Sequence, residues 1–456
     1  MSDINDLKVG FARVNVTPVM GINISGYYKV RLADGVLDDV EINAIAIRKA
    51  NDTVLMLSID NLGIKTEIIA PVIKDISLKT GICVEAIFVS STHTHTAPMI
   101  DSPSDIPYGD GSAEREYLDF LRKKAVDASC FAIADLKPAK MGIGIGIAPG
   151  ISFLRRFRMK DGSVATNPGV NNPDIVAPIG VVDERVNVVR FDRAGAETVI
   201  LANFGDHPDT VGGNKISADW PGFFRRETEK ALDNVKCIFF NGAQGDVNHV
   251  NVHPKGGDLN DTFIDFDDVS RGYGHTRYMG RVVTGAVLQT FDKVEYIDAD
   301  KLKFIRRVIK VPSNKCSPEE LPLAKKYNDL HVAGKDSEIP YKGMMLTTVV
   351  AEAQRKIRLE NAPDYFEMEL SGIAIGDIAF IGIPGEPFTG IGIELKNAEG
   401  WKMVLPCCCT NGYEGYFPMK EAYDEGGYET GSSDFKAGVA EIIIEEGKKL
   451  LNSLKR

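Results

Sequence analysis

The chain has 456 residues, with 53 Lys plus Arg against 64 Asp plus Glu, and therefore a formal net charge of −11. This acidic balance excludes a generally basic, nucleic-acid-coating surface, and an apolar content of 44% is ordinary for a globular protein. No run approaches the ~18 consecutive apolar residues that a membrane span needs. We therefore expect a globular protein that binds no nucleic acid and has no stable membrane association.

In chain order, short apolar runs alternate with amphipathic stretches. The pattern predicts strand 54–59, helix 65–79, strand 86–90, helix 113–136, strands 141–148 and 198–204, helix 220–232, strand 237–240, helix 277–291, strand 301–311, helix 346–359, strand 378–383, helix 390–398, strand 403–405 and a closing helix 436–454. Such alternation predicts an α/β fold with large mixed β-sheet layers covered by helices. The more polar segment 312–339 is a candidate insertion rather than a domain boundary.

The N-terminus and the cysteines indicate the compartment. The first eight residues contain neither a basic nor an apolar signal region, so we expect no secretory signal. Three of the seven cysteines, Cys407 to Cys409, are consecutive and lack the CxxC spacing of a zinc ribbon. We therefore expect buried thiols in a reducing environment and a cytoplasmic location.

Several apolar runs end in loops that contain His, Asp or Glu. His93 and His95 follow run 86–90, His207 follows run 198–204, and Glu386 follows run 378–383. Residues two apart in an extended chain point the same way, so both histidines of the HxH pair are expected to face one pocket. Sites in open α/β sheets form beyond the carboxyl ends of strands. Imidazole plus carboxylate suits Zn²⁺ first, and Fe²⁺ or Mn²⁺ after it.

Other common catalytic motifs are absent from the sequence. There is no GxSxG nucleophile elbow and no phosphate-binding GxxxxGK[ST] loop. The GxGxG run that begins at Gly142 lacks the remainder of a dinucleotide-binding fingerprint. A zinc-activated water, with its pKa lowered to roughly 7, would supply a nucleophile without Ser or Cys.

Ordered motifs along most of the chain resemble the neutral/alkaline non-lysosomal ceramidases, a family of zinc amidohydrolases. The matching segments are THTHTAP at 92–98, His207 with ISADWPG at 216–222, NGAQGD at 241–246, PGE at 384–386, GYFP at 415–418 and GYE at 427–429. The spacing of Tyr416, Tyr423 and Tyr428 is the most specific match, because three tyrosines at these offsets have no periodic explanation.

The resemblance implies particular roles for residues of this chain. It implies that one Zn²⁺ is bound by His93, His207, Glu386 and Tyr416. It places His95 and Tyr428 beside the water and the scissile carbonyl, and Arg156 near the family's oxyanion-binding arginine, with Arg155 as the competitor. It also implies that residues 1–456 form a single catalytic domain like the N-terminal domain of neutral ceramidase.

Three departures from the family make ceramide an unexpected substrate. Asn248 stands where the ceramidases have an important serine, and neither the C-terminal immunoglobulin-like domain nor the signal peptide of secreted members is expected here. No basic amphipathic surface helix is evident either. We therefore expect a zinc-dependent hydrolase that cleaves an amide (C–N) bond of a small, polar molecule.

Three alternatives remain open at this stage. The same metal centre could act on an ester, a lactone or a carbohydrate derivative. A binuclear metallophosphoesterase could instead use Asp60, Asp206, Asp209 and Asp246. The third alternative is a metal-stabilised binding protein that has lost its activity.

Overall fold

The computed structural model describes residues 7–101, 109–254 and 272–455. Segment 1–6, which includes most of the region expected to lack a secretory signal, lies outside the described residues. No helix in the described part of the chain combines the length and the apolar character needed to cross a membrane.

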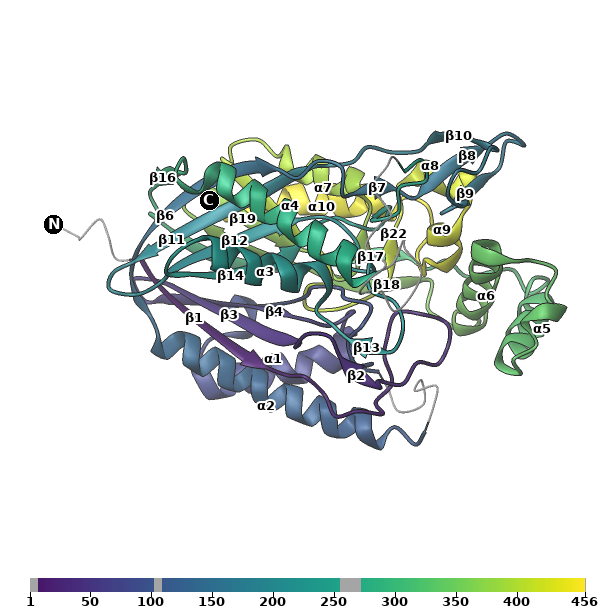
Figure 1. Ribbon diagram of the computed structural model, residues 1–456, viewed down its shortest axis with the longest axis horizontal. Helices are drawn as coiled ribbons and strands as arrows, with labels where there is room; N and C mark the ends of the chain where they lie inside the picture. Colours follow the sequence, from purple (N-terminus) through teal and green to yellow (C-terminus); the bar gives the residue numbers. More distant parts are fainter. Residues whose placement is uncertain (1–6, 102–108, 255–271, 456) are drawn as a thin grey trace.

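Two β-sheets form the centre of the molecule (Figure 1). The nine-stranded sheet has the order β14 (Val235–Asn241), β12 (Thr198–Phe204), β11 (Arg185–Arg193), β6 (Lys137–Ile147), β1 (Leu7–Asn15), β3 (Glu41–Lys49), β4 (Asp52–Ile59) and β5 (Ile87–Ser91), with β16 (Glu295–Ile297) paired to β6. The four-stranded sheet has the order β17 (Leu302–Pro312), β18 (Tyr365–Ile375), β19 (Ile378–Gly382) and β21 (Met403–Cys407). Within them, β12–β14, β4–β5 and β19–β21 are parallel pairs.

Helices cover the outer faces, which gives four layers. The nine-stranded sheet is covered by α1 (Thr66–Thr80), α2 (Ser112–Ala134), α3 (Asp219–Ala231) and α4 (Tyr273–Phe291). The four-stranded sheet is covered by α7 (Thr389–Lys396) and α10 (Val439–Lys455). Strand β3 shows why both faces are apolar: Ala44 packs toward the helices, whereas its neighbour Ile45 packs between the sheets.

Shorter elements lie around one end of the sheets. The strands are β10 (Ile175–Pro178), β8 (Arg156–Met159) and β9 (Val164–Thr166) in one small sheet, and the pairs β13 (Lys215–Ile216) with β2 (Gly35–Val36), β15 (Val247–Asn248) with β7 (Phe153–Leu154), and β20 (Glu386–Pro387) with β22 (Tyr416–Phe417). The helices are α5 (Leu321–Val332), α6 (Gly343–Arg358), α8 (Lys420–Glu425) and α9 (Tyr428–Ser432). Helices α5 and α6 form a hairpin that projects from the body (Figure 1).

The predicted α/β class with large mixed sheet layers is confirmed. Strand β12 has the predicted bounds, and most other predicted elements differ by a few residues at their ends. The sequence patterns missed β1, β3, β11 and β18, because alanines or alternating polar residues interrupt their apolar runs. The predicted sheet layers are present, but the patterns did not say which strands form each sheet, and the candidate insertion contains α5.

A half-buried ion pair makes stability depend on pH. Asp183, before β11, accepts a hydrogen bond from the ammonium group of Lys396, at the end of α7, at 2.9 Å, and another from Arg185 at 2.7 Å. Burial alone would raise the pKa of the Asp183 carboxyl, but Arg185 and Lys396 lower it to about 2. The folded-state pKa is therefore below the unfolded value of ~3.9, so the stabilisation is present above that value and is lost as the pH falls toward 2.

We expect Asp183→Asn to reduce the free energy of unfolding at neutral pH by ~1–2 kcal/mol, after allowance for solvent screening. Denaturant titrations between about pH 5 and pH 2 should show the gap between variant and wild type closing as the pH falls. Asp174→Asn is the control, because Asp174 is mostly exposed in its pair with Lys160. A gap that stays constant over this range would contradict the assignment.

Candidate metal centre

The loops that follow the strands of both sheets meet at one edge of the fold. Strands β4, β5, β12 and β14 of the large sheet and β19 and β21 of the small sheet all lead into this region. Backbone hydrogen bonds join the loops, from Cys408 N to Asn241 O at 2.9 Å and from Gly242 N to Phe204 O at 2.9 Å. The structure therefore brings together the polar loops that follow the predicted apolar runs.

Three of the predicted metal ligands converge on one point. The Nε2 atoms of His93 and His207 lie 3.2 and 3.0 Å from the same carboxylate oxygen, Oε2 of Glu386. His93 follows β5, His207 follows β12, and Glu386 opens β20 after β19, so both sheets contribute. All three side chains are almost completely buried.

His95 belongs to the same cluster. Its Nε2 lies 3.3 Å from Nε2 of His93, and donor atoms of His93, His95 and His207 all lie within 4.8 Å of one another. The two rings face one pocket as predicted, but the extended chain assumed in that prediction is wrong. His93 has a φ of +73°, in the left-handed region that non-glycine residues rarely adopt and that is concentrated at functional sites.

The hydrogen bonds of the rings test whether a cation fits. The Nδ1 atom of each ring lies beside a backbone carbonyl oxygen. The distance is 2.6 Å from His93 to the Leu62 oxygen, 3.1 Å from His95 to the Gly26 oxygen, and 2.8 Å from His207 to the Gln244 oxygen. If each Nδ1–H donates to its carbonyl, the Nε2 atoms present lone pairs to one another and to the carboxylate. These buried acceptors repel one another unless a cation lies between them, and nitrogen and oxygen donors suit zinc. The residues therefore fit a metal ion.

The protonation states agree with that fit. Burial and then the charge of Arg155 lower the pKa of His207 to about 4. Burial and then the charges of His93 and His207 lower the pKa of His95 well below its usual value. Neutral imidazole is the form that binds a metal, so neither ring has to lose a proton at neutral pH.

Two tyrosines from the segment after β21 contact the cluster, Tyr413 from the loop and Tyr416 from the start of β22. The Tyr416 hydroxyl lies 3.5 Å from Nε2 of His207. Burial raises the pKa of Tyr416 well above its usual value, with Arg155 opposing, so a phenolate here needs the field of a cation. The Tyr413 hydroxyl donates a hydrogen bond to Oε1 of Glu386 at 2.7 Å. The sequence motifs did not single out Tyr413, although it lies in the same tyrosine-rich segment.

The two neighbouring arginines both approach the buried Glu429 carboxylate, Arg155 at 2.7 Å and Arg156 at 3.8 Å, but their other partners differ. Nη1 of Arg155 lies 3.3 Å from Nε2 of His207, and its guanidinium lies 5.1 Å from the centre of the Tyr416 ring. Arg156 turns away, toward Glu425 at 3.2 Å and the Gly426 carbonyl at 2.8 Å. The sequence favoured Arg156, whereas the structure places its competitor Arg155 at the cluster. Arg155 lies in the one-residue connection between β7 and β8, whereas Arg156 opens β8, and this places the two guanidiniums among different partners.

Tyr428 lies at the border of the cluster. Its ring centre is 5.6 Å from that of Tyr416, and its hydroxyl is 3.3 Å from the hydroxyl of Tyr28. The Tyr27 ring centre lies 5.7 Å from that of His95, and Oδ1 of Asp209 lies 3.6 Å from Nδ1 of His95. Tyr27 and Tyr28 were not predicted, because they come from a loop near the N-terminus that contains no recognisable motif.

Three other residues considered from the sequence have partners behind or beside the cluster. The Asn248 side-chain amide donates to Oδ1 of Asn167 at 3.1 Å. Asp246 accepts hydrogen bonds from the backbone N–H of Thr389 at 2.7 Å and from its hydroxyl at 3.0 Å. Asp60 accepts a hydrogen bond from the Arg225 guanidinium at 2.9 Å. These two carboxylates therefore support the loops and do not join the imidazoles, so the two-metal alternative loses two of the four carboxylates it named.

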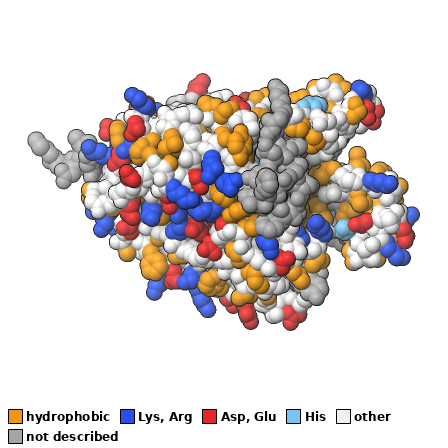
Figure 2. Space-filling view, viewed as in Figure 1, with side chains coloured by type: hydrophobic (Ala, Val, Ile, Leu, Met, Phe, Trp, Pro, Cys, Tyr) orange, Lys and Arg blue, Asp and Glu red, His pale blue; other side chains and the backbone are white. Residues whose placement is uncertain are grey.

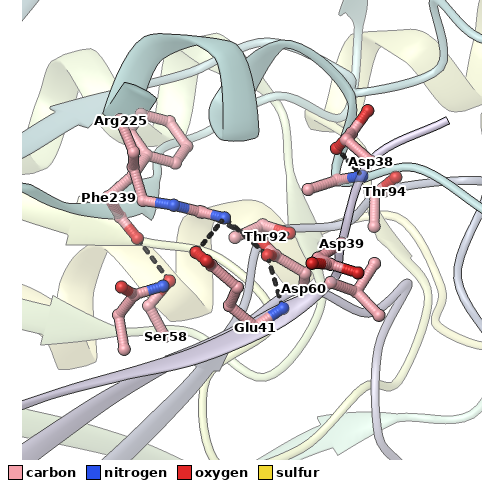
Figure 3. A network of polar contacts seen from close by, with 12 residues as sticks. Asp38, Asp39, Glu41, Ser58, Asp60, Thr92, Thr94, Arg225 and Phe239 are labelled. Carbon is pink, nitrogen blue, oxygen red and sulfur yellow. Dashed lines mark hydrogen bonds and ion pairs between the residues drawn. The ribbon is translucent and has the colours of Figure 1, made fainter. Parts of the chain in front are cut away.

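Figure 3 shows the network around Asp60, at the end of β4. Arg225, on α3, donates to both carboxylate oxygens of Asp60, at 2.9 and 2.5 Å, and both side chains are about 1% exposed or less. Asp60 also accepts hydrogen bonds from the Glu41 backbone N–H at 2.9 Å and from the Thr92 hydroxyl at 3.3 Å. Because Thr92 precedes His93, the ion pair supports the loop that carries the HxH pair.

We expect Arg225→Met to lower the free energy of unfolding by ~3–5 kcal/mol, because it leaves the Asp60 carboxylate buried without its cation. Replacing both partners, with Asp60→Leu added, should recover much of that loss. Arg226→Met is the matched control, since Arg226 is the next residue of α3 and is 33% exposed in its pair with Asp38. Equal losses for Arg225→Met and Arg226→Met in denaturant titrations would contradict this role.

Comparison with known proteins defines the class of fold. The sequence matches no protein-family model and no curated protein. Among solved structures, the chain is similar to the neutral ceramidase from Pseudomonas aeruginosa, with a TM-score of 0.74 and 16% sequence identity over 99% of this chain and 75% of that one. A ceramidase complexed with C2 gives a TM-score of 0.72 at 15% identity, with the same coverage. The protein therefore has the neutral ceramidase fold, as the sequence motifs predicted.

Proposed function

We propose that the protein is a zinc-dependent hydrolase whose single catalytic domain cleaves an amide (C–N) bond of a small, polar substrate. The observation that carries the proposal is the convergence of buried imidazole Nε2 atoms and one carboxylate, with each Nδ1 beside a backbone carbonyl, in a neutral ceramidase fold. His93, His207, Glu386 and Tyr416 would hold the ion. When bound, zinc supplies Lewis acidity to the substrate carbonyl and to the attacking water.

The remaining side chains have separate tasks. His95 takes a proton from the water as it attacks and delivers a proton to the leaving nitrogen, since its Nε2 faces the cluster. The Arg155 guanidinium and the Tyr428 hydroxyl donate hydrogen bonds to the oxygen on which negative charge develops. Arg155 takes the role expected of Arg156 because its guanidinium faces the cluster. Tyr413 orients Glu386.

The experiment that tests this function combines metal analysis with a substrate panel. We expect one tightly held zinc per chain and turnover of small amides that is lost on chelation and restored by added zinc. Small esters belong in the panel, because attack at a carbonyl does not by itself select the leaving group. Two ions per chain with phosphoester turnover would favour the phosphoesterase alternative, and bound zinc without turnover would favour the binding protein.

Ceramide hydrolysis is expected to be absent or very slow. The motivation is that Asn248 replaces the serine of the ceramidase motif and hydrogen-bonds Asn167. Release of fatty acid from a long-chain ceramide in detergent provides the measurement, with a small amide as the positive control. The Asn248→Ser variant tests how much of the difference this position determines. Robust ceramide turnover by the wild-type protein would contradict the expectation.

A further inference from the structure

A pocket of about 410 Å³ lies between the α5–α6 hairpin, the loop that carries Tyr27, and Gly212 with Gly213. Its volume is near the lower end of the ~300–1,000 Å³ typical of small-molecule sites. Figure 2 shows hydrophobic side chains gathered where the hairpin meets the body. Nothing in the metal centre described above uses this pocket, yet two of its walls reach that centre.

Two consecutive tyrosines connect the pocket to the cluster. Tyr27 and Tyr28 both line the pocket. The Tyr27 ring centre lies 5.7 Å from that of His95, and the Tyr28 hydroxyl lies 3.3 Å from that of Tyr428. A molecule held in the pocket therefore contacts two side chains whose other neighbours are the groups proposed to transfer the proton and to bind the oxyanion.

The hairpin is attached to this loop, which shapes the pocket before a ligand arrives. His331, on α5, contacts Oδ1 of Asp336 through Nδ1 at 2.8 Å and the backbone carbonyl of Tyr28 through Nε2 at 3.2 Å. His331 and Asp336 both line the pocket. A preformed pocket reduces the ordering cost of binding, so even a small ligand can be held there.

The chemistry of the walls is mixed. The Arg31 guanidinium lies 4.0 Å from the centre of the Tyr27 ring and covers it, whereas the Tyr28 side chain is 39% exposed. Leu346 adds an apolar wall, and Lys29 and Asp336 bring one charge of each sign. An open aromatic ring with both hydrogen-bond donors and acceptors around it suits a neutral ring that has an apolar face and polar edges.

These features separate three ligand classes. An acyl chain needs an uninterrupted apolar wall, and Lys29, His331 and Asp336 interrupt this one. An anionic ligand would meet the Asp336 carboxylate as well as Lys29, and that carboxylate repels it. A sugar ring places its C–H face on an aromatic side chain and its hydroxyls on donors and acceptors, which this pocket supplies.

We propose that the pocket binds a neutral sugar ring and that the substrate of the metal centre is an N-acylated amino sugar; this rests on the proposed amidohydrolase function. In the reaction, water adds to the amide carbonyl carbon and the C–N bond breaks. The products are a carboxylic acid, which ionises, and the free amino sugar, whose nitrogen takes the proton that His95 delivers. No oxidant, reductant or other co-reactant is required.

Saturation-transfer NMR on the full-length zinc protein with N-acetylglucosamine tests the proposal. We expect saturation of the sugar-ring protons and binding about three- to tenfold weaker in Tyr28→Ala, from loss of the aromatic contact. Tyr341→Ala is the matched control, because Tyr341 has the same 39% exposure but lies outside the pocket lining. Thermal unfolding of both variants checks their fold, and Leu346→Ala offers a second probe of the pocket.

Absence of sugar saturation, equal binding by Tyr28→Ala and wild type, or preferential binding of an N-acetyl amino acid would each overturn the proposal. Acetate released in the same tube reports turnover separately. Sugar binding through Tyr28 without acetate release would support the pocket assignment and contradict amide hydrolysis. Zinc-dependent hydrolysis of other small amides without sugar binding would do the reverse.

Discussion

Replacing Glu386 by Gln is expected to remove zinc from the protein. The carboxylate is the anionic group that faces the imidazoles, with Oε2 at 3.2 and 3.0 Å from His93 and His207. An amide of the same shape has no negative charge and presents either an N–H or a weaker acceptor. We expect affinity to fall by more than the ~10–100-fold caused by losing an outer partner of a ligand, and activity to fall with it.

Zinc content after dialysis and competition with a chromogenic chelator measure the change. Tyr413→Phe provides a graded comparison, because it removes only the hydrogen bond to Oε1 of Glu386 and should weaken zinc binding by ~10–100-fold. Glu114→Gln is the matched control for a buried glutamate. Glu114 lies on α2 and accepts hydrogen bonds from the backbone N–H and the side-chain amide of Asn23. Full zinc occupancy in Glu386→Gln would contradict the proposed ligand set.

His95→Ala has the second largest expected effect. If His95 transfers the proton, the variant should lose ~10²–10⁴-fold in kcat while keeping one zinc per chain. If His95 only orients a ligand, zinc affinity should instead fall by ~10–100-fold and added zinc should restore much of the activity. The geometry allows either proton transfer or orientation of a ligand, because Nε2 of His95 lies 3.3 Å from Nε2 of His93.

The measurement is kcat at increasing zinc, with zinc content determined on the same samples. His253→Ala is the control, because His253 is an exposed histidine outside the cluster. A reduced kcat that added zinc does not restore would support proton transfer. Wild-type activity without added zinc would contradict both roles of His95.

The residues best predicted from sequence were those at the ends of apolar runs. His93, His207 and Glu386 each follow such a run, and parallel neighbours place these ends at one edge. Tyr413 and Arg155 could not be predicted in the same way. Their roles depend on the direction of a side chain in a loop, which no periodicity determines.

Topology was also beyond the sequence patterns. Strands β17 and β18 pair along their whole length although more than fifty residues separate them, from Leu302 paired with Ile375 to Pro312 paired with Tyr365. The apolar residues of β3 predict burial on both faces but do not say whether a helix or a second sheet covers each face. The assignment of strands to each of the predicted sheet layers therefore became evident only from the structure.

The position of the α5–α6 hairpin allows the lining of the pocket to change separately from the donor atoms of the metal centre. It borders the pocket but supplies none of the donor atoms of the cluster, which come from loops at the ends of the sheets. Sequence changes in the hairpin therefore act first on the pocket, and on Tyr28 and Tyr428 through the contacts of His331 and Arg355, whereas the metal-facing donor atoms stay on the loops of the sheets. If the proposed function holds, homologues can diverge in the molecules that the pocket accepts while the metal-facing residues stay constant, and a grafted hairpin is a direct route to altered selectivity.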